Sequence, residues 1–170
     1  MSGEEFGRRC ACLLLLLTFF AQVALSARRT SITLDEPLHI TSGYACLTTG
    51  DYRLVEEHPP LLKMLQAFPL LFAQPPLPDP IHVPGWEEGN LIQAAQHVVV
   101  PYRPIEPLVF AARVPTMLVG VLLAALVMRW ATDAFGGSAG LLALILYVFD
   151  PNMLAHAGVA ATDLGAACAI

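Results

Sequence analysis

The chain has 170 residues, of which 56% are hydrophobic and only 14% are charged, and its mean hydropathy is +0.61. Because soluble domains carry about 25% charged residues, this composition is typical of a membrane protein. The net charge of −5 excludes the basic surface that nucleic-acid binding requires, so no nucleic-acid partner is expected. Four cysteines stand at spacings that fit neither a disulfide framework nor a zinc site: Cys10, Cys12, Cys46 and Cys168.

The first apolar segment covers residues 10–27, between the pairs Arg8–Arg9 and Arg28–Arg29. It is just long enough to cross a bilayer, for which about 20 residues are needed. Small residues near its end also fit a secretory signal with cleavage after Ser26. We favour a retained span, because the chain enters the membrane again later, and we assign residues 1–27 to an N-terminal tail and first span.

The loop that follows, residues 28–107, contains a first helical pattern next to a group of acids. The side chain of Asp35 is placed to cap the start of this helix, and Pro37 fits its first turn. The pattern ends at Gly50, which is typical of a helix C-terminus. We expect this helix to lie in the plane of the membrane interface.

A second helical pattern begins at His58 and continues through "HPPLLKML". It has large apolar residues along one side, as expected for another helix in the interface plane: Leu61, Leu65, Phe68 and Phe72. The proline-rich stretch "QPPLPDPIHVPGW" comes next and is too polar and too rigid to span a membrane. The loop is therefore predicted to be a structured platform with two interfacial helices.

Residues 108–170 contain the remaining spans, and the clearest of them covers residues 108–130. A third run, residues 141–149, is short for a full crossing, and we expect it to continue past Asp150 as a broken or tilted helix. A fourth run begins after Asp163 and is cut off by the end of the sequence. We interpret the chain as the N-terminal fragment of a longer polytopic all-α membrane protein.

Counting crossings places Asp163 on the same side of the membrane as the long loop, so the acids of both segments can converge on one site. Each of these residues also has a plain structural interpretation. Asp35 and Asp163 fit helix caps, His58 fits the start of its helix, and Glu56 with Glu57 fits a solvated patch. Taken together, these structural interpretations explain less well than a shared site does why acids and cations gather at the ends of two interfacial helices.

Four stretches carry a family resemblance: "LDEPLHITSGY", "GDYRLVEEHPPLLKML", "ARVPTMLVG" and "FDPNMLAHAGVAATDLG". Together they resemble the beginning of membrane glycosyltransferases of the GT-C class, and the protein O-mannosyltransferases, the bacterial family-39-type enzymes and the lipid A aminoarabinose transferases are the most similar. The resemblance extends from about Leu34 to Gly165. Its most specific part is the pairing of Asp-Glu after the first span with HPPLxK some twenty residues later.

The resemblance implies a GT-C-like fold and a transferase that uses a polyprenyl-phosphate-linked sugar on the extracytoplasmic side. Asp35 matches the catalytic carboxylate of the Asp-Glu motif, and Asp163 matches a second acid at the start of a later span. His58 and Lys63 match the segment near the donor phosphate, with Glu57 beside them. Family members often have an arginine five residues before the second acid, where this sequence has glycine.

The chemistry of such a reaction agrees with these residue types. A sugar phosphate has a good leaving group, so cations that neutralise the departing phosphate are more useful than a general acid. One carboxylate suffices to accept the proton of the acceptor hydroxyl, which attacks from the opposite face and inverts the anomeric centre. We therefore assign Asp35 and Asp163 to catalysis and five residues to substrate binding: Glu36, Glu57, His58, Lys63 and Arg113.

No cofactor and no metal site are predicted. A divalent cation bound by Glu57 and His58 is conceivable, but two ligands without a third are poor evidence for a site. The expected partners are a lipid-linked sugar donor, membrane lipids, and an acceptor that is a protein, a lipid or a glycan. The expected location is the plasma (inner) membrane, with several crossings and an extracytoplasmic active site.

Two other classes of function remain open. A polytopic transporter would place its ionisable residues within the spans, near the middle of the membrane. A non-catalytic membrane subunit would need no such cluster at all. The acids of this sequence stand at span ends and in the loop, which favours the transferase.

Overall fold

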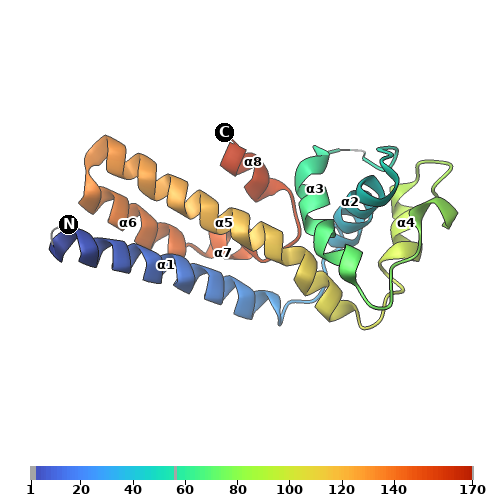
Figure 1. Cartoon of the computed structure of the whole chain (residues 1–170), viewed down its shortest axis with the longest axis horizontal. Helices are drawn as coiled ribbons and strands as arrows, with labels where there is room; N and C mark the ends of the chain where they lie inside the picture. The colour runs from blue at the N-terminus through green and yellow to red at the C-terminus, as the bar shows by residue number, and fades with distance from the viewer. Residues whose placement is uncertain (1–2, 56, 170) are drawn as a thin grey trace.

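The computed structural model describes residues 3–55 and 57–169, and within these ranges the chain is helical and contains no strand. Figure 1 shows a long helical bundle with a compact group of shorter helices at one end. The bundle consists of α1 (Gly3–Ala27), α5 (Ile105–Phe135), α6 (Gly137–Val148) and α7 (Pro151–Ala157). The all-α prediction is confirmed for the described residues.

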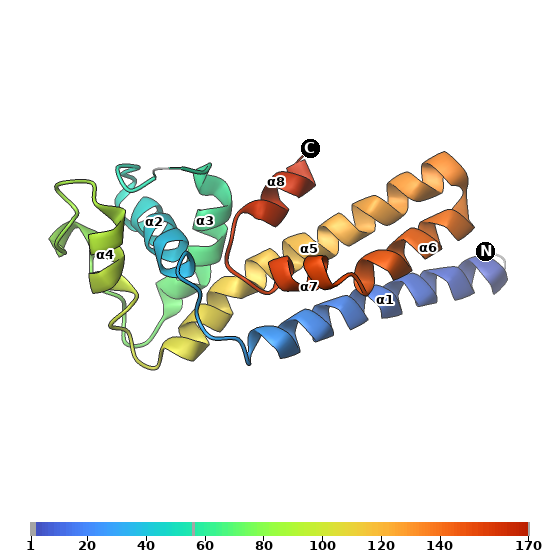
Figure 2. The same cartoon turned by 180° about the vertical axis from the view of Figure 1, so that it is seen from behind.

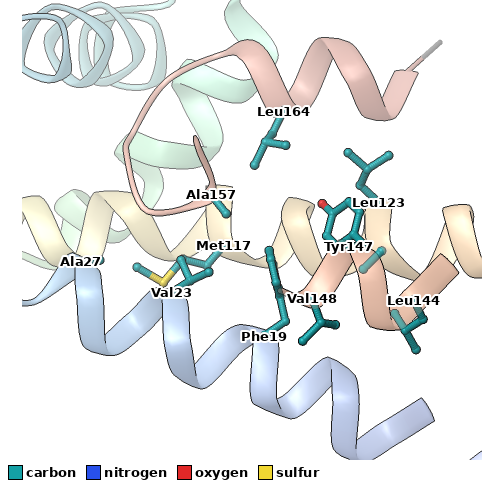
Figure 3. Close-up of a cluster of buried hydrophobic side chains, with 11 residues drawn as sticks. Phe19, Val23, Ala27, Met117, Leu123, Leu144, Tyr147, Val148, Ala157 and Leu164 are labelled. Carbon is teal, nitrogen blue, oxygen red and sulfur yellow. The ribbon is translucent and has the colours of Figure 1, made fainter. Parts of the chain in front are cut away.

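Two helices of the bundle, α1 and α5, are long and apolar enough to cross a membrane. Their packing is tight because Gly120 of α5 faces Phe19 of α1, and a Cβ at this glycine would stand 3.1 Å from the Phe19 ring. Such close approach at a small residue is typical of helices that associate in lipid. Tyr147 of α6 completes the contact by donating a hydrogen bond of 3.0 Å to the Gly120 carbonyl. Figure 3 shows Tyr147 beside Phe19 in the buried apolar cluster of the bundle.

The third apolar segment is broken, as the sequence predicted. Helices α6 and α7 meet at an angle of 64°, and together they are long and apolar enough for one span. The break is stabilised by Asp150, whose side chain accepts hydrogen bonds from the backbone N–H groups of Asn152 and Met153 at 2.8 and 2.9 Å. After α7 the chain reaches the end of the bundle where the shorter helices lie, and α8 (Asp163–Ala169) begins there.

The group of shorter helices, here called the head, covers residues 35–98, from the N-cap of its first helix to the end of its last. It contains α2 (Glu36–Thr49), α3 (Pro60–Ala67), η1 (Phe68–Phe72), η2 (Pro80–His82) and α4 (Leu91–Val98). The predicted end of α2 at Gly50 is confirmed, and this glycine has the left-handed φ of 71° expected at a helix C-terminus. The second predicted helix begins at Pro60 rather than at His58.

Helix α2 is the central helix of the head, where the sequence predicted a helix in the interface plane. Most of its residues from Glu36 to Cys46 are buried, and it packs against both α3 and α4. The contact with α3 is close at Gly43, because a Cβ there would overlap the carbonyl group of Lys63. Burial on several sides leaves α2 without a continuous face for lipid.

Helix α4 was not predicted, although its sequence carries the signals of a helix. The side chain of Asn90 caps its start by accepting a hydrogen bond of 3.0 Å from the Gln93 N–H. Apolar residues recur at helical spacing and are buried in the head: Leu91, Ala94, Ala95 and Val98. The nearby prolines and glycines obscured this short pattern.

Helix α3 and η1 expose the apolar side that the sequence predicted for an interfacial helix. Figures 1 and 2 show α3 lying across the long axis of the bundle, near the end where α1 stops. The exposed fraction is 70% for Leu61 and 71% for Phe72, and Leu65 and Phe68 are also exposed. Large apolar side chains exposed on one face of a helix indicate contact with a membrane or a partner.

We expect this face to lie at the level of the lipid headgroups and the outermost acyl carbons. A nitroxide spin label at Phe68, in a cysteine-free background reconstituted in vesicles, should collide more often with oxygen than with a polar nickel complex. The matched control is Ile81, an exposed apolar residue of η2, which is expected to favour the polar complex. Equal accessibility profiles at Phe68 and Ile81 would contradict the interfacial position of α3.

Candidate functional site

A buried ion pair joins the head to the bundle. Arg113 of α5 donates from Nε to Oε1 of Glu36 and from Nη2 to Oε2, both at 2.7 Å. The two residues are 1% and 0% exposed. Two parallel hydrogen bonds of this kind fix the relative orientation of the two side chains as well as their distance.

The other polar atoms of the pair are also occupied. Nη1 of Arg113 donates to the carbonyls of Ala27 and Thr30 at 2.6 and 2.9 Å, and Nη2 donates to the carbonyl of Ser31 at 3.0 Å. The pair therefore connects α5, the start of α2 and the chain that leaves α1.

Glu36 extends the same network to the segment before α8. Its Oε1 accepts a hydrogen bond of 2.9 Å from the Ala160 N–H, and its Oε2 accepts one of 2.8 Å from the Thr33 N–H. The sequence assigned Glu36 and Arg113 to substrate binding. In the structure these side chains bind each other and the backbone, and we reassign both as residues that position the site.

The surroundings of Glu36 keep its carboxylate ionised. Burial alone would raise its pKa, but hydrogen bonds from Arg113, Ala160 and Thr33 together outweigh this effect and lower the pKa below its usual value. The carboxylate is thus stabilised in its charged form, which is the form that the guanidinium requires.

A polar pocket lies beside this ion pair, in the head. It has a volume of about 280 Å³ and is lined by Asp35, Leu38, His39, Glu57, His58, Lys63, Leu91 and Ile92. Four of the residues that the sequence assigned to the site share this pocket, although they come from two separate segments. The structure brings together Asp35, Glu57, His58 and Lys63.

Asp35 enters the pocket from the start of α2. It occupies the N-cap position, but within the described residues its side chain makes no capping hydrogen bond, contrary to the sequence prediction. Its backbone carbonyl accepts from the N–H groups of Leu38 and His39, each at 3.0 Å. The Asp35 side chain is exposed and lines the pocket.

Lys63 enters the pocket from α3 and is only 2% exposed. Its position depends on the close contact of α3 with α2 at Gly43. Lysine is rarely buried to this extent in proteins unless an opposite charge or hydrogen-bond acceptors surround its amino group. His58 and Glu57, which precede α3, are exposed at the mouth of the same pocket, and Glu56 lies outside the described residues.

His39 is a pocket residue that the sequence analysis missed. It follows Asp35 by four residues, and this helical spacing was the signal that could have identified it. Its ring centroid lies 6.0 Å from that of His58. Burial, followed by the charges of Lys63 and His58, lowers the pKa of His39, whereas Asp35 and Asp163 act in the opposite direction.

Asp163 lies near the pocket without lining it. It is the first residue of α8, and its Oδ2 is 3.3 Å from Nδ1 of His156. Its charge acts on His39, as does the charge of Asp35. Of the two acids expected to converge on one site, Asp35 lines the pocket and Asp163 does not, although the charges of both act on His39.

A larger cavity, of about 570 Å³, lies between the end of α1 and the start of α5. It is less suited to chemistry than the polar pocket. Arg113 lines it, but the hydrogen bonds of this guanidinium are already satisfied inside the protein. Arg28 lies over the ring of Phe110 at 4.9 Å, so this cation packs against an aromatic face.

A metal centre is not apparent in the part of the chain that the structure describes. Within residues 3–55 and 57–169, no group of three or more His, Cys, Asp or Glu side chains is arranged to hold a metal ion. Comparison with known proteins adds no further information, since no family model, no curated protein and no solved structure matches the chain.

We expect the Glu36–Arg113 pair to dominate the stability of the head. Arg113→Met leaves a buried carboxylate without its partner and should lower the free energy of unfolding by about 3–5 kcal/mol. Chemical or thermal unfolding of the protein in detergent measures this loss. Arg129→Met is the matched control, because its partner Asp133 lies on the surface in an i, i+4 pair, and it should change stability little.

The ion pair also predicts a pH dependence. Because folding lowers the pKa of Glu36, its carboxylate contributes stability that is complete above the unfolded-state pKa and decreases as the pH falls towards the folded-state pKa. The stability difference between the natural protein and Glu36→Gln should therefore shrink in acid.

The role given to the pair would be contradicted if Arg113→Met lowered the free energy of unfolding no more than Arg129→Met does.

Proposed function

We propose that the chain is part of a membrane glycosyltransferase that moves a sugar from a polyprenyl-phosphate donor to an acceptor hydroxyl. One observation supports this proposal more than any other. A carboxylate, a buried ammonium group and a histidine line one pocket at the end of a bundle with two membrane-length helices: Asp35, Lys63 and His58. The proposal agrees with the resemblance in sequence, which covers the same residues.

The pocket residues have two tasks in the proposed reaction. Lys63 and His58 neutralise the phosphate as the bond between the anomeric carbon and the phosphate oxygen breaks and the electron pair leaves with the phosphate. The acceptor oxygen forms the new bond to the anomeric carbon from the opposite face, and its proton passes to Asp35. Inversion at the anomeric centre follows from this geometry.

The position of the pocket fits a donor with a lipid tail. It lies on one side of α3, while the exposed apolar residues Leu61 and Leu65 line a separate apolar pocket with Val119 of α5. A polyprenyl chain in the bilayer can thus remain close to a sugar phosphate in the polar pocket. We place the protein in the plasma (inner) membrane with several crossings, and the head on the extracytoplasmic side.

The proposed acceptor is the hydroxyl of a protein, a lipid or a glycan, which reaches the pocket from the aqueous side. Asp163, close to the pocket and paired with His156, is placed to orient this acceptor or the sugar. A transporter is less consistent with the structure, because the described acids of the pocket lie in the head rather than within α1 or α5.

Asp35→Asn tests the proposal. Asparagine has the same size as aspartate and also suits the N-cap position, but it lacks the basicity that the reaction needs. Transfer should fall by about a hundredfold or more, in line with the usual contribution of a positioned base, while donor binding is retained. The assay is sugar transfer by the natural protein in vesicles that contain the lipid-linked donor.

Asp79→Asn is the matched control, because Asp79 is an acid of the same head that caps η2 by accepting from the Ile81 N–H at 3.2 Å. This variant should transfer sugar normally. A near-normal rate for Asp35→Asn would show that Asp35 is not the base.

A further inference from the structure

His39 is one of the residues that line the polar pocket, and the reaction described above does not use it. Its helix, α2, holds Asp35 one turn earlier, and its ring lies 6.0 Å from that of His58. Lys63 lines the same pocket from α3, and Leu91 and Ile92 of α4 contribute apolar side chains to its lining. An imidazole at this place can donate a hydrogen bond to a ligand from either ring nitrogen, depending on its protonation.

The charges around His39 come from four elements of the fold. Lys63 from α3 and His58 from the segment before α3 act to lower the pKa of His39, whereas Asp35 from the start of α2 and Asp163 from α8 act to raise it. Glu57 lines the pocket beside His58. Burial, Lys63 and His58 together outweigh the two acids and lower the pKa of His39 below its usual value, which favours the neutral ring in the ligand-free pocket.

An anion in the pocket reverses this balance. A phosphate group close to Lys63 cancels the charge that disfavours protonation of the imidazole, and it adds a negative charge that favours protonation. The same phosphate provides oxygen acceptors for the second N–H of the ring.

We propose that His39 takes up a proton when a phosphate group of the donor enters the polar pocket, and that the resulting imidazolium donates a hydrogen bond to this phosphate. His39 thus joins Lys63 and His58 as a third ligand of the phosphate. It carries a positive charge only while the phosphate is bound. The ligand class, a phosphodiester, rests on the proposed function. The proton uptake itself rests on the placement of His39 among Lys63, His58, Asp35 and Asp163.

The sign of the resulting pH dependence follows from linkage. Because the bound state holds His39 at a higher pKa than the free state, affinity rises as the pH falls between these two pKa values. Below the free-state pKa the ring is protonated with or without ligand, and affinity levels off. One proton taken up per ligand strengthens binding by up to about tenfold for each pH unit in that interval.

The experiment measures binding of citronellyl methyl phosphate, a sugar-free phosphodiester whose own charge is constant over the range studied. Titration calorimetry of the whole protein in detergent, from about pH 5.5 to 8.5, is done in two buffers of different ionisation enthalpy, which gives the number of protons taken up. We expect uptake approaching one proton in the natural protein. We also expect His39→Gln to lower this uptake and to weaken the pH dependence of the Kd.

Two control variants separate His39 from its neighbours. His156→Gln removes the imidazole paired with Asp163 outside the pocket and should keep the uptake of the natural protein. His58→Gln should weaken binding but retain the uptake. If His58→Gln abolishes the uptake and His39→Gln retains it, the proton belongs to His58 and the inference is wrong.

The remaining outcomes distinguish the inference from the proposed function. Binding of the phosphodiester without proton uptake in the natural protein would overturn the role of His39 and leave the donor site intact. This result needs no variant, so it does not depend on the folding of His39→Gln. Absence of binding at every pH would overturn the phosphate site of the proposed function and the inference with it.

Discussion

The carboxylate of Glu36 and the guanidinium of Arg113 meet where four parts of the chain come together, and the geometry of the head depends on this contact. Removing two charges from water is costly, and the cost is offset only if every polar atom of the pair finds a partner. Here the backbone supplies those partners, from the carbonyls of Ala27, Thr30 and Ser31 and the N–H groups of Thr33 and Ala160. The pair therefore holds the end of α1, the start of α2, α5 and the segment before α8 in one arrangement.

The adjacent acids Asp35 and Glu36 have opposite roles because neighbouring residues at a helix start face different directions. Glu36 is buried and bound to Arg113, whereas Asp35 is exposed and lines the polar pocket. Fixing Glu36 fixes the first turn of α2, and with it the direction of the Asp35 carboxylate and of His39 one turn later. The buried acid thus positions the exposed one, which explains why a motif of two consecutive acids is useful at a single site.

Features that depend on local sequence were largely predictable. The end of α2 at Gly50, the break after residue 149 and the exposed apolar side of α3 follow from residues near one another in the chain. The grouping of Asp35 with His58 and Lys63 was predicted from the resemblance in sequence. The membrane-length helices were evident from composition and run length.

Features that depend on contacts between distant segments were not predictable in the same way. Arg113 lies 77 residues from Glu36, and no local pattern indicates that the two bind each other rather than a substrate. The burial of Lys63 and the central place of α2 depend on the close approach at Gly43, which only the packed structure reveals. The Asn90 cap of α4 and the spacing of His39 from Asp35 were both present in the sequence. They were overlooked because prolines surround α4 and because the stronger Asp-Glu motif stands just before His39.

The central claim is that the polar pocket holds the phosphate of a lipid-linked donor, and photocrosslinking tests it most directly. A polyprenyl phosphate with a diazirine on the first isoprene unit, added to the protein in vesicles and irradiated, labels the residues next to its phosphate. The account predicts labelled peptides from residues 35–39 and 57–63, and loss of this labelling when unlabelled polyprenyl phosphate is added in excess. Labelling confined to residues 105–110, at the larger cavity between α1 and α5, would contradict it.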